Sequence, residues 1–252
     1  MKLTAIDLFC GLGGWTEGLL AEGYEVVGFD IERHEYGEHK YPAQLVLQDV
    51  LTLHGSQFKD ATLIVASPPC QAYSYRAMPW KRAKALPPPS NELFDACFRI
   101  QREAIAAAGH FIPLVVENVC GAQKWVGRAR WHYGSFYLWG DVPALMPEPR
   151  KAVKVAGMGA GWKPPGHPQH VPGLAFNTHA ERAIKNNGGS WFNVAHNTTS
   201  GKGRNPDGRK AGVARKHASA MIAKIPLDLS RHVARVWKAA LPVPETIAND
   251  RQ

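Results

Sequence analysis

The sequence lacks several features that would assign it to a familiar class. The 252-residue chain has no apolar run of about 18 residues, and its start has no apolar signal-peptide core, so we expect neither a membrane span nor a secreted protein. It has only four cysteines and no C-x-x-C pair, which disfavours a disulfide scaffold or a thiolate zinc site and indicates reduced thiols in a cytoplasm. A Gly-Lys-Ser/Thr P-loop is also absent.

Acidic residues are scarce in one part of the chain. Residues 151–220 contain 11 Lys and Arg but only two acids, and this block accounts for the whole net charge of +9. It also holds 11 of the 24 glycines, shows little periodicity and is too long for a simple loop. A polyanionic partner would explain the charge, and a solvated basic region is the alternative. His167 and His170 lie here without clustered carboxylates or thiols, so we expect no metal site.

The start of the chain follows the pattern of a nucleotide-binding α/β unit. An apolar strand is predicted over residues 3–9, a glycine-rich turn over 11–14 and a helix over 15–22. Glycines let a backbone approach a ligand closely. The turn is weak evidence by itself, because such turns also close ordinary strand–helix connections.

Acids follow the next two predicted strands. The strand over residues 25–30 ends in Asp30, which could accept the ribose hydroxyls of a nucleoside. A helix is predicted over 33–40, and the strand over 45–47 ends near Asp49, a candidate for contacting adenine. Either acid alone could be a solvated loop carboxylate, but the two together, downstream of the glycine turn, favour a nucleoside site.

A cysteine follows the fourth predicted strand, residues 62–66. Pro68 and Pro69 fix φ near about −65° on the way to Cys70, so the thiol is held at the rigid end of a strand. Open α/β sheets place their reacting groups there. A structural cysteine beside a Pro-Pro turn is the alternative. The basic loop over 75–90 could cover a site or contact phosphate.

The fifth predicted strand, residues 113–119, is apolar until Glu117 and Asn118. Desolvation after Leu-Val-Val would raise the pKa of the glutamate and suit it to holding a proton, whereas an ion-paired acid is the alternative. Before this strand, Asn91 could cap a helix that buries Cys97. Beyond it, a strand over 133–139 and a last helix over 227–240 are predicted.

Four segments, in order, resemble the DNA (cytosine-5)-methyltransferase family, most closely its compact phage or bacterial members. They are the cofactor motif at residues 7–14, the Pro-Cys-Gln loop at 68–74, Glu-Asn-Val at 117–119 and Arg-x-Arg at 128–130, the last without its usual preceding glutamine. The resemblance spans residues 1–140. Residues 222–226 depart from it, because they read Ile-Ala-Lys-Ile-Pro where the family has a Gly-Asn motif.

The resemblance implies a fold and a set of partners. The expected fold is α/β, a Rossmann-like AdoMet-dependent methyltransferase sheet with helices on both faces. The expected catalytic domain covers residues 1–145, an irregular basic target-recognition region 146–215, returning helices 216–241 and a tail 242–252. S-adenosylmethionine is the implied cofactor and double-stranded DNA the implied partner. We further expect a cytoplasmic monomer without metal or membrane, linked to restriction-modification.

The resemblance also assigns chemical roles. Cys70 would add to C6 of a flipped-out cytosine, and Glu117 would hold or protonate N3. The implied catalytic residues are Cys70, Glu117, Asn118, Arg130, Arg128 and Gln71. The implied cofactor-binding residues are Phe9, Gly11, Gly13, Gly14, Asp30, Ile31, Asp49, Val50, Pro69 and Leu93. Methylation of cytosine in RNA such as tRNA stays open, as does a non-catalytic nucleic-acid-binding protein of the same fold.

Overall fold

The computed structural model describes residues 2–36, 38–76, 81, 85–147, 220 and 223–239. The chain divides into one unit made of Met1–Pro147 and Ile225–Gln252, and a second made of Glu148–Lys224. Almost all of the second unit lies outside the described residues. The target-recognition region over 146–215, its histidines and the tail over 242–252 therefore stay predictions.

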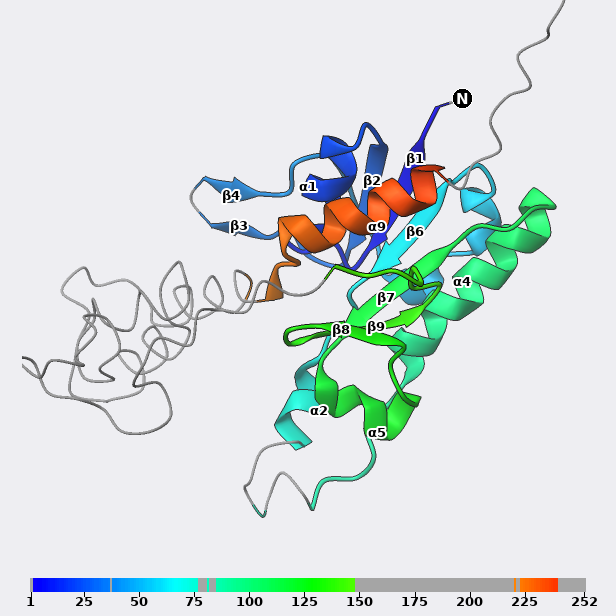
Figure 1. Ribbon diagram of the computed structural model, residues 1–252. Coiled ribbons are helices and arrows are strands. Elements are labelled where there is room, and N and C mark those ends of the chain that lie inside the picture. Colours follow the sequence, from blue (N-terminus) through cyan, green and yellow to red (C-terminus); the bar gives the residue numbers. More distant parts are fainter. Residues whose placement is uncertain are drawn as a thin grey trace, which may run out of the picture. The chain divides into compact units, whose positions relative to one another are not determined.

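A seven-stranded mixed sheet forms the centre of the first unit (Figure 1). Its order is β5–β2–β1–β6–β7–β9–β8. The strands are β1 (Thr4–Leu8), β2 (Glu25–Asp30), β5 (Gln44–Leu47), β6 (Leu63–Ala66), β7 (Leu114–Asn118), β8 (Trp131–Tyr133) and β9 (Phe136–Gly140). The strands β5, β2, β1, β6 and β7 run parallel to one another, and β9 is antiparallel to both of its neighbours, β7 and β8. The chain moves outward from β1 in both directions, which creates the switch point where such sheets bind ligands.

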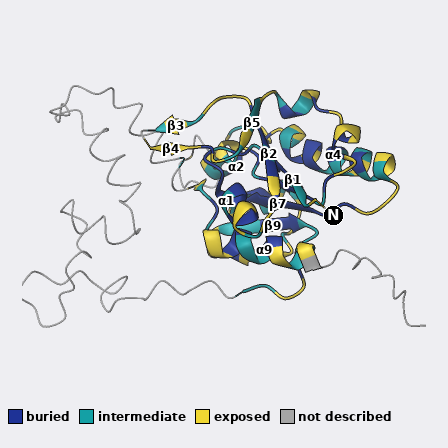
Figure 2. Ribbon diagram, turned by 90° about the horizontal axis from the view of Figure 1, so that it is seen from above, coloured by how far each residue is buried: buried dark blue, intermediate teal, exposed yellow. Residues whose placement is uncertain are grey.

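Helices cover both faces of the sheet, as expected. One face packs against α4 (Glu92–Ala108), η1 (Val50–Thr52) and η2 (Gly55–Phe58). The other packs against α1 (Gly14–Ala21) and α9 (Leu227–Ala239), which lie side by side in Figure 1. Strands β6 and β7 are buried along their whole length, as their continuous apolar runs predict. The burial of β7 can be seen in Figure 2.

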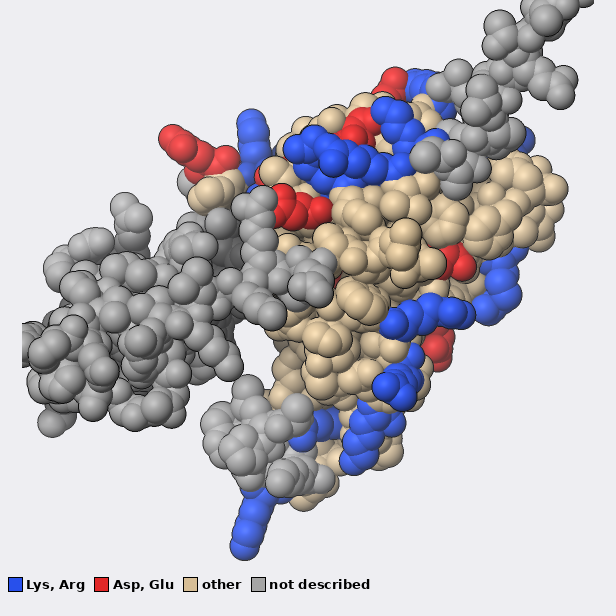
Figure 3. Space-filling view, viewed as in Figure 1, with Lys and Arg blue, Asp and Glu red and all other residues tan. Residues whose placement is uncertain are grey.

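The C-terminal helix α9 is tied to α1 by charge and by close packing. Glu22 Oε1 accepts from Arg231 Nε at 2.8 Å and pairs with Arg235 Nε at 2.9 Å, while Lys238 Nζ donates to the Glu22 carbonyl at 2.8 Å. Figure 3 shows Lys and Arg atoms beside acidic ones over this region. At Gly18 a Cβ would clash with Ser230, so glycine permits the helices to approach. Together, α1 and α9 thus cover this face of the sheet.

Some local predictions are wrong. Residues 33–40 form no helix but the hairpin β3 (Glu35–Tyr36) and β4 (His39–Lys40), because the segment has no apolar face to bury and carries a central glycine. The strand over 133–139 is interrupted, since Gly134, at φ 60°, turns β8 back into β9. The loop over 75–90 begins later, because α2 (Gln71–Arg76) includes its first two residues.

Asn91 occupies the N-cap position of α4, but its side chain does not cap the helix. Its Oδ1 accepts from the Tyr73 hydroxyl at 3.1 Å, and its Nδ2 donates to the Trp125 carbonyl at 3.0 Å. Ser90 Oγ accepts from the Glu92 N–H instead, at 3.2 Å. Tertiary partners therefore outcompete the local cap. Cys97 lies in the core, as predicted.

Candidate active site

The turn after β1 has an unusual backbone that opens toward the switch point. Phe9, at φ 57°, is the one non-glycine residue with positive φ in the described part of the chain, and Gly11 and Gly13 follow at 50° and 75°. The Cys10 N–H donates to the Phe29 carbonyl at 3.1 Å and holds this shape. A Cβ at Gly11 would meet nothing within 4 Å, so that side of the turn is open to a ligand. Strain of this kind is typical of ligand sites.

Asp30 is held against the glycine turn. Its Oδ2 accepts from the Gly11 N–H at 2.9 Å, and its Oδ1 accepts from the Glu32 N–H at 3.3 Å and lies 3.6 Å from His34 Nε2. Burial opposes ionisation of this carboxyl, but the hydrogen bonds from His34, Gly11 and Glu32 outweigh it and lower its pKa. An ionised carboxylate therefore stands at the end of β2, as the ribose prediction requires.

Asp49 and Val50 lie beyond the neighbouring strand end. Strand β5 pairs in parallel with β2, with Leu47 opposite Asp30, so Asp49 follows at the same edge of the sheet. Its Oδ1 accepts from the Leu51 N–H at 2.9 Å and caps η1. Val50 is buried. The structure thus gathers Gly11, Asp30 and Asp49 around one edge.

The apolar residues expected around the cofactor differ in exposure. Ile31 is 74% exposed, an unusual state for a large aliphatic side chain directly after a core strand. Phe9 and Leu93 are half-buried, and Pro69 is exposed. An ionised carboxylate, an open glycine turn and uncovered apolar side chains form a set that fits a nucleoside with an apolar edge, such as S-adenosylmethionine.

A buried polar cluster lies behind the glycine turn, and its residues were not expected at the site from sequence. Asp7 Oδ2 accepts from Thr16 Oγ1 at 2.6 Å, and Thr16 Oγ1 lies 2.6 Å from the Tyr41 hydroxyl. Asp7 Oδ1 has no hydrogen-bond partner among the described residues, and burial raises the pKa of this carboxyl to about 7. An acid inside an apolar strand was the available signal. Tyr41 could not have been found, because only the fold brings it to Thr16.

Cys70 lies between β6 and α2, half-buried. The N–H groups of Tyr73 and Ser74 donate to its carbonyl at 3.0 and 2.9 Å, which fixes it at the start of α2. Burial raises the pKa of the thiol, a hydrogen bond with Ser74 opposes this, and the nearby charge of Glu117 adds to it. The thiol and the carboxyl therefore interact electrostatically.

Glu117 is 9% exposed at the end of β7. Burial raises its pKa to about 8, against an opposing hydrogen bond from Ser67. The raised pKa predicted from sequence is confirmed. Ser67 Oγ also accepts from Trp15 Nε1 at 3.0 Å, so a helix and two strand ends converge on this carboxyl. At neutral pH most of the carboxyl is protonated.

Asn118 joins β7 to the cysteine loop. Its Nδ2 donates to the Pro68 carbonyl at 2.9 Å, and its Oδ1 accepts from the Val119 N–H at 2.8 Å. The side chain is buried, so these bonds are sheltered from water. Asn118 therefore fixes the loop two residues before Cys70. The structure brings Cys70, Glu117 and Asn118 together.

Arg128, Arg130 and Gln71 are exposed. Arg130 enters the sheet through its backbone, since its N–H donates to the Leu138 carbonyl at 2.9 Å. The described groups that set the Cys70 pKa are Ser74 and Glu117, and neither arginine is among them. The catalytic roles of these three exposed residues stay predictions.

Metal-binding groups and membrane-spanning helices were also sought among the described residues. No group of three or more His, Cys, Asp or Glu in the described ranges is placed to bind a metal ion. No helix within the described part of the chain is both long and apolar enough to cross a membrane.

Comparison with known families identifies the segment that carries these groups. Residues 3–124 match the sequence model of the C-5 cytosine-specific DNA methylase family. This segment is therefore similar to that family. The methylase segment includes the glycine turn, Cys70, Glu117 and Asn118, and ends before Arg128. A comparison with curated proteins gives no significant match.

Several solved methyltransferases match part of the chain. A protein described as a DNA modification methyltransferase encoded within an E. coli prophage is 25% identical, over 50% of this chain and 34% of its own, with a TM-score of 0.36. The S. pombe Dnmt2 methyltransferase is 18% identical, over 49% and 36%, with a TM-score of 0.34. The chain thus matches about a third of the length of these two proteins.

Proposed function

We propose that this protein transfers a methyl group from S-adenosylmethionine to C5 of a cytosine in DNA. One observation carries the proposal: within a C-5 cytosine-specific DNA methylase segment, the buried Glu117 carboxyl lies within electrostatic reach of the Cys70 thiol. A thiol and a protonated carboxyl at neighbouring strand ends are the two groups that addition to a pyrimidine requires.

The cofactor would lie at the carboxyl ends of β1, β2 and β5. Asp30 would accept the ribose hydroxyls, and Asp49 and Val50 would contact the adenine. The remaining binding residues would be Phe9, Gly11, Gly13, Gly14, Ile31, Pro69 and Leu93. S-adenosylmethionine supplies an electrophilic methyl group on a sulfonium.

The residues at the neighbouring edge would supply the covalent chemistry. The Cys70 thiolate forms a bond to C6 of cytosine, and the electron pair of the C5–C6 double bond becomes available at C5. The Glu117 proton at N3 offsets the charge that builds on the ring. After C5 is methylated, water takes the C5 proton, the electron pair of that C–H bond re-forms the C5–C6 double bond, and the C6–S bond breaks to release the Cys70 thiolate. The proton on N3 returns to Glu117.

The protonation of Glu117 serves this sequence twice. An ionised Glu117 would oppose the Cys70 thiolate, since its charge raises the pKa of the thiol. With a pKa of about 8, the carboxyl is mostly neutral at pH 7, so it both offers a proton to N3 and removes that repulsion. Asn118 holds the Pro68 carbonyl and keeps the loop at this distance.

The substrate would be double-stranded DNA with the target cytosine turned out of the stack, at a cost of a few kcal/mol. The positive charge of residues 151–220 favours a phosphate backbone. Arg128, Arg130 and Gln71 would hold the base or the loop, and the segment 75–90 would cover it. We further propose a cytoplasmic monomer that uses no metal.

Transfer of a radiolabelled methyl group tests the proposal. The wild type should label duplex DNA but not tRNA, and Cys70→Ser should abolish labelling while S-adenosylmethionine binding survives. Cys120→Ser, at an exposed cysteine, is the matched control and should keep full activity. Labelling of tRNA alone would overturn the DNA substrate, and turnover by the Cys70→Ser variant would overturn the covalent role.

A further inference from the structure

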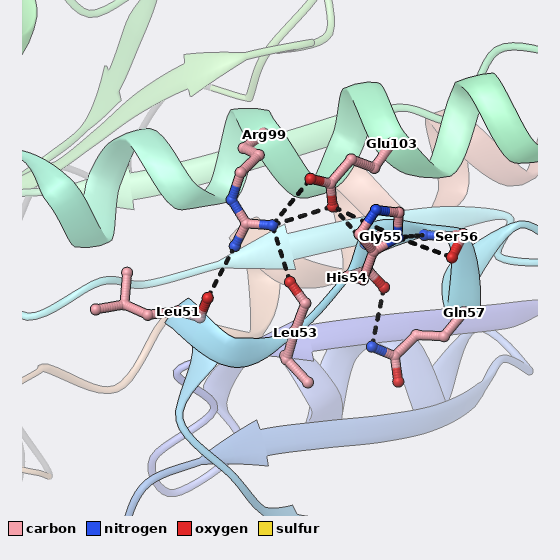
Figure 4. A network of polar contacts seen from close by, with 8 residues as sticks. All are labelled: Leu51, Leu53, His54, Gly55, Ser56, Gln57, Arg99 and Glu103. Atoms are coloured by element: carbon pink, nitrogen blue, oxygen red, sulfur yellow. Dashed lines mark hydrogen bonds and ion pairs between the residues drawn. The ribbon is translucent and has the colours of Figure 1, made fainter.

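The segment that carries Asp49 and Val50 is held in place from α4 by an ion pair (Figure 4). Arg99 and Glu103, one helical turn apart, lie 3.0 Å from each other through Nη1 and both carboxylate oxygens. Their side chains point away from the helix toward the chain between η1 and η2. Both side chains also bond to backbone groups of this segment, from Leu51 to Gly55.

Arg99 binds the carboxyl end of η1. Its Nη1 donates to the Leu53 carbonyl at 2.9 Å and its Nη2 donates to the Leu51 carbonyl at 3.2 Å. Carbonyl groups at the end of a helical turn have no partner within it, and a cation there is favourable. Asp49 caps the other end, through the Leu51 N–H. Leu51 therefore bonds to both side chains, because its N–H donates to Asp49 and its carbonyl accepts from Arg99.

Glu103 holds the next turn. Its Oε2 accepts from the Gly55 N–H at 2.6 Å, at the first residue of η2. Gly55 lies so close to the Ile100 carbonyl of α4 that a Cβ would clash with it. The helix thus contacts η1 through a cation and η2 through an anion. The side chains of Arg99 and Glu103 are 35% and 23% exposed, so water competes only in part.

A three-residue 3₁₀ turn does not hold its shape alone, because one turn closes too few hydrogen bonds to offset the order it imposes. The position of Asp49 and Val50 is consequently set by what η1 is attached to. The Gln48 amide and Thr52 hydroxyl are bonded at 3.1 Å, but both are exposed. The bonds from Arg99 are charge-assisted and partly sheltered, and so constrain the turn more strongly.

We propose that Arg99 and Glu103 are positioning residues for the adenine end of the cofactor. They touch neither cofactor nor nucleic acid, and act by fixing η1 so that Asp49 and Val50 present one surface to the adenine. The inference rests on the proposed function, since it assigns that surface to S-adenosylmethionine. It requires that these residues affect the affinity for the cofactor and not the rate of methyl transfer.

Isothermal titration of the full chain with S-adenosylmethionine and S-adenosylhomocysteine, without nucleic acid, tests this. Arg99→Met should raise both Kd values roughly tenfold, equivalent to about 1.4 kcal/mol. Arg99→Lys should give an intermediate value, because an ammonium cannot bond two carbonyls and the carboxylate in the same fork geometry. Arg102→Met, at an exposed arginine of the same helix, should bind like the wild type.

Kinetics separate positioning from general damage. At saturating cofactor, Arg99→Met should keep kcat within about twofold of the wild type, with KM for the cofactor raised in step with Kd. Amide exchange should accelerate at residues 50–53 and stay unchanged in β6 and β7. If Arg99→Met does not fold, Glu103→Gln carries the same expectation through Gly55 and is measured in its place.

The outcomes distinguish this inference from the proposed function. Wild type that binds cofactor, with variants that bind it equally tightly, would overturn the role of Arg99 and Glu103 alone. A fall in kcat at saturation with unchanged Kd would also overturn it. Wild type that binds neither S-adenosylmethionine nor S-adenosylhomocysteine would overturn the proposed function, and this inference with it.

Discussion

The protonation of Glu117 gives a quantitative test of the site. The folded state raises the pKa of this carboxyl from 4.5 to about 8, mainly through burial. A raised folded-state pKa means that the folded protein binds the proton more tightly than the unfolded chain does. The associated stability is therefore complete below pH 4.5, falls as the pH rises, and is lost above about pH 8.

The size of the effect follows from the shift. A rise of the pKa from 4.5 to about 8 corresponds to about 5 kcal/mol over the whole range, or at most about 1.4 kcal/mol per pH unit within it. Between pH 5.5 and 7.5 the free energy of unfolding should fall by about 2–3 kcal/mol on account of Glu117 alone. This is a large share of the stability of a typical domain.

Glu117→Gln isolates this contribution. The amide has nearly the shape of the protonated acid and does not titrate, so its variant lacks the pH dependence that comes from Glu117. Urea unfolding of both proteins at pH 5.5, 6.5 and 7.5 gives the difference in unfolding free energy at each pH. Asp7, whose pKa is also raised, titrates in both proteins, so its contribution cancels in the difference.

The variant should gain on the wild type by about 1.4 kcal/mol for each pH unit. A change of packing on substitution would shift the difference by the same amount at every pH, so it cannot imitate the slope. A difference that stays constant from pH 5.5 to 7.5 would show that Glu117 is ionised in the folded protein. The proposed double role of its proton would then be refuted.

Two further substitutions probe contacts around the site. Asn118→Ala removes the donor to the buried Pro68 carbonyl and should cost about 1–3 kcal/mol in urea unfolding and lower kcat, with S-adenosylmethionine affinity unchanged; unchanged kcat would contradict the loop-holding role. Gly28→Ala would drive a Cβ against the Tyr41 hydroxyl and Cys10 Sγ, and should destabilise the fold by about 1–3 kcal/mol; an unchanged urea midpoint would show that Tyr41 moves aside without cost.

The sequence by itself determined the elements whose local pattern and tertiary environment agree. The strands that end in Asp30, Ala66 and Asn118 are continuous apolar runs, and runs of that kind are stable only when buried on both faces. Burial of a carboxyl after Leu-Val-Val predicts the raised pKa of Glu117, whereas at Asp30 hydrogen bonds outweigh burial and lower the pKa.

The tertiary structure alone decided which residues meet across the chain. Asn91, which local sequence marks as a helix cap, bonds instead to Tyr73 and to the Trp125 carbonyl. The contacts from Arg99 to Leu51 and Leu53 join positions more than 40 residues apart. Local propensity describes only near neighbours, whereas partners at that separation are chosen by the packing of α4 against the sheet.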